Sequence, residues 1–356
     1  MPSATMEYPM SDYRYAFLEP GHFARGWHIV RFSRELAVGE VQRLHYFNRD
    51  LVLFRGESGA AAVVDAHCPH LGAHLASDGG RLIGDTIACP FHGWTFAGDG
   101  ECVSIPYAGK IPDKARRALR GWPLLEKNGF ISLWYDPDDN PPEDYLPDIS
   151  AWGPDSWGDW HFHRSRIRAQ PCDVIENIVD IAHFPHVHGG EVRAFENRFG
   201  ERTVTQLSTV DRSANAQMVI PPDLPFDLQA MSQQAVEQRS DAWGDATYHG
   251  PAIMYYYTEV RSELMSFSSW WVNYHTPVND EEVDLCSAVI LNSLTDEPLP
   301  AEFVELYAQT AHAAFGQDVE IWKDKVFRAD PILCDGDGPI NKLRRWYEQF
   351  YLPLAG

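Results

Sequence analysis

Two short segments of the chain each carry one cysteine and one histidine in a loop-like setting. The sequence reads CPHLGAHL at residues 68–75 and CPFHGWTF at residues 89–96. Cys68 with His70, and Cys89 with His92, bring a thiol and an imidazole close together in each loop, and 18 residues separate the two pairs. Two ligands on one tight loop bind a metal at little additional entropic cost, so these four side chains are predicted metal ligands.

The arrangement of these ligands distinguishes between zinc and an iron–sulfur cluster. Zinc fingers usually pair Cys-x2-Cys with His-x3-5-His, whereas each loop here supplies one Cys and one His. That symmetry suits a Rieske [2Fe–2S] cluster, in which one iron takes both thiolates and the other takes both imidazoles. A structural zinc is the alternative. His67 and His74 lie beside the loops and are interpreted as polar neighbours.

Charge and composition exclude several other classes of protein. A length of 356 residues predicts two domains, and a formal net charge of −22 argues against binding to nucleic acids or anionic membranes. No stretch approaches about 18 consecutive apolar residues, so no membrane span is expected. The first residues lack the basic and apolar regions of a secretory signal, which predicts a cytoplasmic protein with free or metal-bound cysteines.

The pattern along the chain predicts an all-β domain followed by an α+β domain. Runs rich in Val, Ile, Phe and Tyr predict strands in the first domain, at 27–32, 49–56, 60–66 and 130–136. Residues 137–159 are dense in Pro and Asp, as in a linker. The predicted organisation is a leader (1–23), a Rieske domain (24–136), a linker (137–159) and a catalytic domain (160–356).

In the second domain, spacing predicts a helix over 173–187 and a long amphipathic helix over 301–327. Strands are predicted near 203–211, 251–260, 264–274 and 283–292. Segment 221–249 is polar and poorly periodic, which predicts a lid or a disordered loop.

A second group of candidate ligands lies in the sequence ENIVDIAHFPHVHGG at 176–190. One iron needs two imidazoles and a carboxylate on one face, which leaves the opposite positions open for dioxygen and substrate. His183 and His186 would share a face of a regular helix, but Pro185 disturbs the helix and the Gly-Gly pair ends it. The spacing therefore leaves His186 and His188 as alternatives for the second imidazole.

The carboxylate is predicted on the long helix. Asp318 falls on an inward-facing stripe that otherwise holds Phe303, Tyr307, Ala311, Ala314 and Trp322. A buried Asp is costly unless it is paired or binds a metal, so Asp318 is a candidate iron ligand, with a structural ion pair as the alternative. Glu320 and Asp324 fall off the stripe and are interpreted as solvated.

These residues make the chain resemble the catalytic α subunit of Rieske non-haem iron oxygenases over nearly its whole length. It is most similar to 3-ketosteroid 9α-hydroxylase oxygenases and cholesterol 7-desaturases, and less so to aminopyrrolnitrin-type arylamine oxygenases. The family pattern Asn-x2-Asp-x2-His-x4-His falls on Asn177, Asp180, His183 and His188. The helix-borne Asp of the family falls on Asp318. The resemblance therefore implies His188 rather than His186 as a ligand.

The resemblance also implies the fold and the cofactors. The expected fold is α+β, with an all-β Rieske domain followed by a helix-grip (START-like) catalytic domain that has an antiparallel sheet and a long C-terminal helix. The expected cofactors are a Rieske [2Fe–2S] cluster and a mononuclear Fe(II). Ala73 and Phe91 stand where respiratory Rieske proteins carry a disulfide, so that bridge is not expected.

The same resemblance implies a head-to-tail homotrimer, in which the cluster of one subunit lies close to the iron of its neighbour. Asp180 would then bridge a cluster imidazole of the adjacent chain to His183. Asn177, which belongs to the same motif, is assigned to the catalytic set with Asp180.

The expected function is that of the terminal oxygenase component of a multicomponent monooxygenase. Electrons would come from NAD(P)H through a ferredoxin or a flavin/iron–sulfur reductase, and O2 would hydroxylate a small hydrophobic substrate such as a steroid. N-oxygenation of an arylamine, desaturation and demethylation are alternatives on the same scaffold. A Rieske electron-transfer protein and a zinc-stabilised lipid-binding or interaction module are alternatives from other classes, and neither explains the motif from Asp180 to His188.

Two further features have a functional and an ordinary interpretation. Residues 110–121 (KIPDKARRALRG) carry five cations against one Asp, which would suit docking of an acidic ferredoxin, or else a solvated loop or a subunit contact. The aromatic and amide side chains of Tyr255, Tyr257, Trp271 and Asn273 alternate along predicted strands. They line a cavity in one interpretation and form ordinary sheet core in the other.

Overall fold

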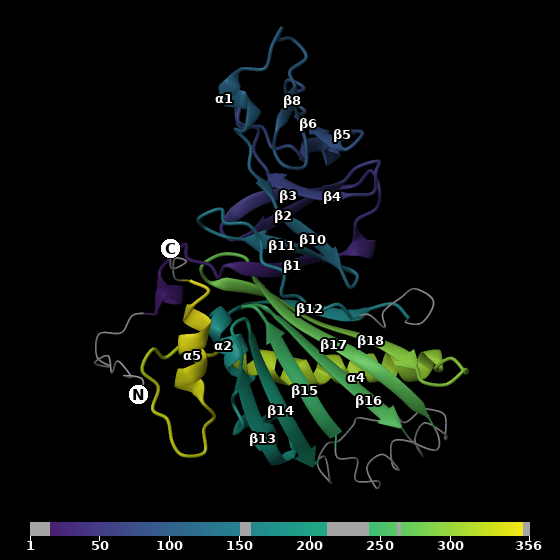
Figure 1. Ribbon diagram of the computed structural model, residues 1–356, viewed down its shortest axis with the longest axis vertical. Helices are drawn as coiled ribbons and strands as arrows, with labels where there is room; N and C mark the ends of the chain where they lie inside the picture. The colour runs from purple at the N-terminus through teal and green to yellow at the C-terminus, as the bar shows by residue number, and fades with distance from the viewer. Residues whose placement is uncertain (1–14, 150–157, 212–241, 262–264, 352–356) are drawn as a thin grey trace.

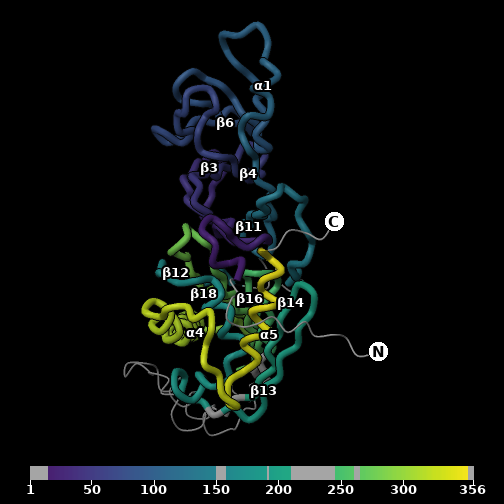
Figure 2. Tube along the Cα trace, turned by 90° about the vertical axis from the view of Figure 1, so that its left-hand side faces the viewer, coloured from purple at the N-terminus to yellow at the C-terminus, as the bar shows by residue number. Residues whose placement is uncertain are grey.

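The computed structural model describes residues 15–149, 158–211, 242–261 and 265–351, and the chain forms an elongated molecule with two parts (Figure 1). The N-terminal part consists of small antiparallel sheets and occupies one end. The C-terminal part consists of one large sheet with helices packed against it. The same division is visible after a quarter turn (Figure 2).

The N-terminal part contains three small sheets with strand orders β1-β11-β10, β2-β3-β4-β9 and β5-β6-β7-β8. Its strands are β1 (Gly26–Phe32), β2 (Val41–Tyr46), β3 (Arg49–Arg55), β4 (Ala61–Asp65), β5 (Arg81–Ile83), β6 (Thr86–Ala88), β7 (Thr95–Phe96), β8 (Cys102–Ser104), β9 (Gly121–Trp122), β10 (Leu124–Lys127) and β11 (Phe130–Tyr135). Short helical turns are η1 (Ala16–Leu18), η2 (Ser33–Glu35), η3 (Ser77–Gly79) and α1 (Asp113–Arg116). The four strands predicted in this region are confirmed as β1, β3, β4 and β11.

The C-terminal part is built on a seven-stranded antiparallel sheet with the order β12-β18-β17-β16-β15-β14-β13. Its strands are β12 (His161–Arg168), β13 (Glu191–Phe199), β14 (Thr203–Asp211), β15 (Ala242–His249), β16 (Ile253–Arg261), β17 (Ser266–Pro277) and β18 (Glu282–Ser293). The helices are α2 (Pro171–Glu176), the π-helical turn η4 (Phe184–His188), α4 (Ala301–Trp322) and α5 (Ile340–Glu348). Antiparallel sheet and long helix agree with the expected α+β fold.

The sheet buries both of its faces, and side-chain alternation assigns each residue to one of them. Val272 and Tyr274 of β17 belong to a core shared with Trp27 and Trp134 of the N-terminal part. Phe267, whose side chain points to the opposite face of β17, packs with residues of α4. The N-terminal part therefore covers one face of the sheet and α4 covers the other.

Most predicted elements of the second part are confirmed, with two corrections. Strands β14, β16, β17 and β18 lie where they were predicted, and α4 begins at Ala301 and ends at Trp322. The prediction of one helix over 173–187 is wrong, because α2 ends at Glu176. The prediction of a lid or loop over 221–249 is wrong for β15, which the structure describes from Ala242, and its earlier residues lie outside the described ones.

The break after α2 has a local cause. The Asp180 carboxylate accepts the backbone N–H groups of Ala182 and His183, at 2.9 and 3.3 Å, so these donors do not continue the helix. The chain resumes as the turn η4, with Pro185 near its start and Gly189 at its end in the left-handed region (φ 68°).

No helix among the residues that the structure describes is long and apolar enough to cross a bilayer.

The segment between α4 and α5 passes directly over the turn that follows α2. A Cβ placed on Gly338 would lie 1.5 Å from the carbonyl oxygen of Val179, the residue before Asp180. Only glycine permits this approach of two backbones. Gly336, two residues earlier, has open space around the same position.

We predict that Gly338→Ala destabilises the protein by about 3 kcal/mol, because the clash is with a backbone atom that cannot rotate away. Gly336→Ala is the matched control and should change the free energy of unfolding by less than about 0.5 kcal/mol. Denaturant unfolding of both variants measures the difference. Equal stabilities would show that the contact at Gly338 is not tight.

Candidate metal centres

The two Cys–His loops of the N-terminal part share one backbone design. In the first, the Cys68 N–H donates to the carbonyl of Ala73 at 2.9 Å, and the Gly72 N–H donates back to the carbonyl of Cys68 at 2.9 Å. The second repeats both bonds around Cys89, at 2.7 and 3.0 Å, with Gly93 as the returning donor. Both glycines have positive φ, 78° and 74°, so each loop closes through a left-handed residue.

These loops bring the four predicted cluster ligands together. Cys68 and Cys89 are buried, and the His70 and His92 rings lie 4.8 Å apart. Burial raises the pKa of the Cys68 thiol to about 12, and the adjacent Cys89 adds to this. His70 Nδ1 is buried without a hydrogen-bond partner, as a ligand atom would be before a metal binds.

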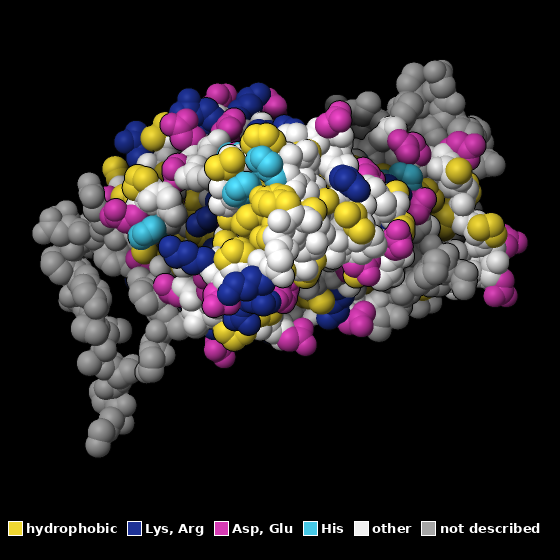
Figure 3. Space-filling view, turned by 90° about the horizontal axis from the view of Figure 1, so that it is seen from above, with side chains coloured by type: hydrophobic (Ala, Val, Ile, Leu, Met, Phe, Trp, Pro, Cys, Tyr) yellow, Lys and Arg dark blue, Asp and Glu magenta, His cyan; other side chains and the backbone are white. Residues whose placement is uncertain are grey.

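The neighbours of the loops also have clear positions. His67 and His74 form a backbone bridge with each other, and their rings lie 5.2 Å apart at the surface. Leu71, Phe91 and Tyr107 are more than half exposed around the ligands. Seen from this end of the molecule, histidine side chains lie at the surface beside hydrophobic ones (Figure 3).

The basic run at 110–121 contains two arginines that contact acidic or aromatic side chains and three other cations that are exposed. Arg120 stacks on the Trp122 ring at 3.7 Å and pairs with Asp139 at 2.5 Å. Arg116 approaches acidic neighbours at 3.8 and 3.9 Å. Lys110, Lys114 and Arg117 are exposed.

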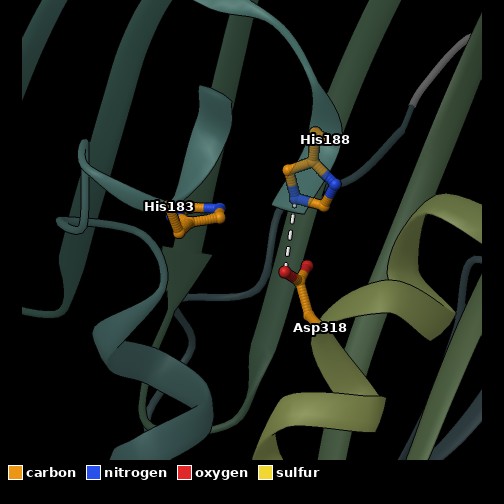
Figure 4. A group of neighbouring side chains, drawn as sticks. All are labelled: His183, His188 and Asp318. Atoms are coloured by element: carbon orange, nitrogen blue, oxygen red, sulfur yellow. Dashed lines mark ion pairs between the residues drawn. The ribbon is translucent and has the colours of Figure 1, made fainter. Parts of the chain in front are cut away.

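A second group of ligands lies between α4 and the turn after α2. His183, His188 and Asp318 each offer one ligand atom, and these atoms lie within 4.8 Å of one another (Figure 4). His188 Nε2 lies 3.2 Å from Asp318 Oδ1, and the two imidazole rings are 5.1 Å apart. Asp318 is 7% exposed, so its charge lies inside the protein. His186 is exposed and takes no part in this group.

The turn η4 explains how histidines five positions apart meet. Its backbone closes with the Gly189 N–H donating to the Phe184 carbonyl, a bond that spans five residues instead of four. On an α-helix, side chains five positions apart point in different directions. The wider turn brings His188 towards the side of His183.

Hydrogen bonds to the ring nitrogens fix which atom of each imidazole faces the group. His183 Nδ1 lies 2.7 Å from the backbone oxygen of Asp180, and His188 Nδ1 lies 2.9 Å from Gln317 Oε1. Both oxygens only accept, so each Nδ1 atom carries a proton, and Nε2 is the atom of each ring that a metal would bind. Asn177 Nδ2 donates to Asp318 Oδ2 at 3.3 Å.

Asp180 lies beside this group and is partly open to solvent. Its side chain is 38% exposed, and its Oδ2 is 3.8 Å from His183 Nδ1. Burial raises the pKa of the carboxyl, but interaction with the His183 ring and the backbone N–H groups of Ala182 and His183 outweighs it, so the pKa is lowered overall. The carboxylate is therefore ionised beside the His183 ring.

Comparisons with known proteins agree with this geometry. The family model described as the Rieske [2Fe–2S] domain matches residues 26–116, and that of the 3-ketosteroid 9α-hydroxylase C-terminal domain matches residues 133–351. The oxygenase component of a 3-ketosteroid-9-alpha-monooxygenase from Rhodococcus rhodochrous is 37% identical, over 94% of this chain and 83% of that protein.

This chain belongs to the Rieske oxygenase family. The cholesterol 7-desaturase of Caenorhabditis elegans is also similar, at 31% identity over 93% of this chain and 78% of that protein. Among solved structures, dicamba monooxygenase bound to dicamba covers 93% of this chain and 98% of its own, with a TM-score of 0.69 and 20% identity, a likeness of fold.

As a Rieske non-haem iron monooxygenase, the protein carries a Rieske cluster and a mononuclear iron. The four Cys and His side chains fit a cluster better than a single zinc ion. Ligands of one tetrahedral zinc lie roughly 3.5–4 Å apart, given bonds of about 2.0–2.3 Å. Among the described residues, only His183, His188 and Asp318 offer three such atoms within 4.8 Å. The Cys and His ligands are more widely spread, as the two irons of a Rieske cluster require.

The mononuclear site also fits the residues that are present. Two imidazoles bound at about 2.1 Å to one ion place their ring centres roughly 5 Å apart, and the rings of His183 and His188 are 5.1 Å apart. With Asp318 they form a set of two histidines and one carboxylate, which suits Fe(II) and leaves coordination positions open.

The cavity interpretation of the strand aromatics needs a correction. The strand register pairs Tyr255 with Val272 and Tyr257 with Trp270, so these two tyrosines lie on the face covered by the N-terminal part. Trp271 and Asn273 lie on the opposite face, towards α4. The four residues therefore do not line one cavity.

Sequence reasoning missed two supports of the iron site. Gln317, next to Asp318, binds His188, and no periodic signal marks it because it lies on the exposed side of α4. Glu176, next to Asn177, is buried and accepts hydrogen bonds from Arg344 of α5 and Lys325. Its pairing depends on residues about 150 positions away, which local patterns cannot show.

We predict that Asp318→Ala loses the mononuclear iron but keeps the Rieske cluster, so that iron falls from about three to about two atoms per chain. Glu320→Ala is the matched control, because Glu320 is exposed on the same helix and pairs only with Lys323 among the contacts described. Metal analysis and the EPR signal of the reduced cluster measure both sites. Full iron content in Asp318→Ala would contradict this assignment.

Proposed function

We propose that this protein is the terminal oxygenase component of a 3-ketosteroid hydroxylase. The observation that carries the proposal is the convergence of His183, His188 and Asp318 inside a domain that matches the 3-ketosteroid 9α-hydroxylase model. Relatives named as 3-ketosteroid-9-alpha-monooxygenase components share 32–37% identity over 94% of this chain, and one from Mycobacterium tuberculosis is 32% identical.

Two buried polar side chains lie on the face of the sheet towards α4, and they are the polar groups nearest to what a hydrophobic substrate would need. Tyr248 is buried near Asp318: burial raises the pKa of its hydroxyl, and the carboxylate raises it further. Asn273 lies on the same face of the sheet, and its Oδ1 is buried without a partner. A ring system with one polar anchor would satisfy this combination.

Each site residue has a role in the proposed reaction. When bound, the two metal centres supply electrons and activate dioxygen. His183, His188 and Asp318 would hold the iron, and Asn177 orients the Asp318 carboxylate through its hydrogen bond. Cys68, His70, Cys89 and His92 hold the cluster. Asp180, ionised and partly exposed, accepts a hydrogen bond from a cluster imidazole of the neighbouring chain.

The proposal includes an external electron donor, either a ferredoxin or a flavin/iron–sulfur reductase. The exposed cations Lys110, Lys114 and Arg117 lie in the Rieske domain, and they would attract an acidic partner. Such attraction weakens as salt screens the charges. A coupled rate that does not depend on ionic strength would argue against docking at this run.

The function is tested by supplying the purified protein with NADH, a reductase that couples and a 3-ketosteroid, and identifying the product by mass spectrometry. We expect one added oxygen atom per molecule, derived from O2. Asp180→Ala should keep both metal centres and lower turnover by at least about 100-fold, because the electron path is broken. His186→Ala is the control and should turn over normally. No steroid oxidation by the wild-type protein, with both metals bound, would contradict the substrate class.

We further propose a head-to-tail homotrimer. Leu71, Phe91 and Tyr107 expose an apolar surface beside the cluster ligands, and Ile332 and Leu333 expose another on the segment after α4. Contact between two different apolar surfaces is heterologous, and it closes into a ring if the rotation permits. This contact would place the cluster of one chain beside Asp180 of the next.

Mixing two inactive variants tests this assembly. Cys68→Ser lacks the cluster and Asp318→Ala lacks the mononuclear iron, so each homotrimer should be inactive. In randomly mixed trimers, roughly a quarter of the contacts join an intact cluster to an intact iron, and activity should recover to about that fraction. Mixed trimers that stay inactive while both proteins keep their remaining metal would show that electrons do not cross between chains.

A further inference from the structure

The hydrogen bond between His188 and Gln317 differs in kind from the one that holds His183. His183 Nδ1 donates to a backbone carbonyl, that of Asp180, which no substitution can remove. His188 Nδ1 donates to a side chain, the amide oxygen of Gln317, at 2.9 Å. The Nδ1 atom of one imidazole is therefore held by the backbone, and the Nδ1 atom of the other is held by a side chain.

We infer that Gln317 is a positioning residue that sets the affinity of the mononuclear site for its metal, through the tautomer and orientation of His188. This inference rests on the proposed role of His188 as an iron ligand. His188 is held on both sides by adjacent residues of α4, at Nδ1 by Gln317 and at Nε2 by Asp318. One turn of one helix thus provides both a metal ligand and the acceptor that orients a second ligand.

The position of the proton on the His188 ring decides whether Nε2 can bind a metal. A neutral imidazole carries one proton, and metal binding at Nε2 requires that proton to be on Nδ1. The Gln317 oxygen accepts the proton and keeps the ring plane fixed. Without this acceptor, His188 populates the other tautomer and other ring rotations, and metal binding must overcome that loss.

The identity of residue 317 also sets the basicity of His188. A carboxylate at this position would accept the same hydrogen bond, add a negative charge and raise the basicity of the imidazole. The neutral amide orients the ring without adding charge to a site that already contains the buried carboxylate of Asp318. Replacing Gln317 by Leu should therefore weaken metal binding, whereas replacing it by Glu should preserve or strengthen it.

The experiment measures metal binding rather than turnover. The holoprotein is stripped of mononuclear iron with a mild chelator that leaves the Rieske cluster, which its visible absorption reports, and is titrated anaerobically with Fe(II) and with Co(II). We expect Gln317→Leu to weaken binding by 10- to 100-fold, on the order found when such partners are removed. Gln317→Glu should bind at least as tightly as the wild type. Gln309→Leu is the matched control, because Gln309 lies on the same helix and bonds only to exposed Glu305 among the contacts described.

Each outcome of the titration decides the inference. Equal affinities of wild type and Gln317→Leu, with normal cluster absorption, would overturn the role of Gln317 and leave the proposed function intact. A wild-type protein that binds neither metal at this site would overturn both. Weakened binding in Gln317→Leu and Gln317→Glu alike would also overturn it, because a residue that only supports the fold is not rescued by a hydrogen-bonding replacement.

Discussion

A carboxylate buried on a helix is the constraint around which the catalytic part is organised. Asp318 is 7% exposed on α4, and an isolated charge at such a position would cost several kcal/mol. Its Oδ1 lies 3.2 Å from His188 Nε2, and its Oδ2 accepts a hydrogen bond from Asn177 Nδ2 at 3.3 Å. Both partners belong to the segment after α2. The need to compensate this one charge ties α4 to the α2–β13 connection, and the proposed iron would complete the compensation.

That connection must depart from regular helix to meet Asp318. Asp180 takes the N–H groups that would continue α2, and the wider turn η4 then brings His188 to the side of His183. The irregular backbone is held from outside by a close approach of Gly338 to Val179 and by the buried pairing of Glu176 with Arg344. Rigid neighbours thus support a locally unusual chain, which is a common arrangement where ligands must be placed accurately.

The sequence predicted the features that depend on local pattern. The two Cys–His loops are short, and their glycines fall where the chain needs positive φ, so spacing alone predicted four side chains that the structure brings together. Strands β14 and β16–β18 are rich in β-branched, aromatic and other apolar residues, and the inward position of Asp318 follows from helical periodicity. The helix over 173–187 failed because periodicity does not report a side chain, Asp180, that competes for backbone donors. For the same reason, spacing could not choose between His186 and His188, and only the family pattern did.

Strand β12 was missed for a different reason. Its sequence HFHRSRIR is mostly polar, because it lies at the edge of the sheet and its outer side chains form ion pairs, such as Arg166 with Asp284 at 2.6 Å. Edge strands need only one apolar face and often carry charges, so composition indicates a loop. Gln317 escaped notice in the same way, because an exposed polar residue on a helix has no distinguishing pattern until its partner is placed beside it.

The elongated shape of the chain separates the loops of the cluster ligands from the part that contains α4. Strands β5–β8, which flank the cluster loops, lie at one end of the elongated molecule, and α4 lies in the part at the other end (Figures 1 and 2). The shared core of β1, β11 and the catalytic sheet fixes the two parts relative to each other, so a hinge motion that closes this separation would have to break buried aromatic packing. The ionised Asp180 is partly exposed beside the iron ligands, and the cluster ligands are surrounded by exposed apolar side chains. Both surfaces are therefore exposed in the single chain, as the proposed contact between chains requires.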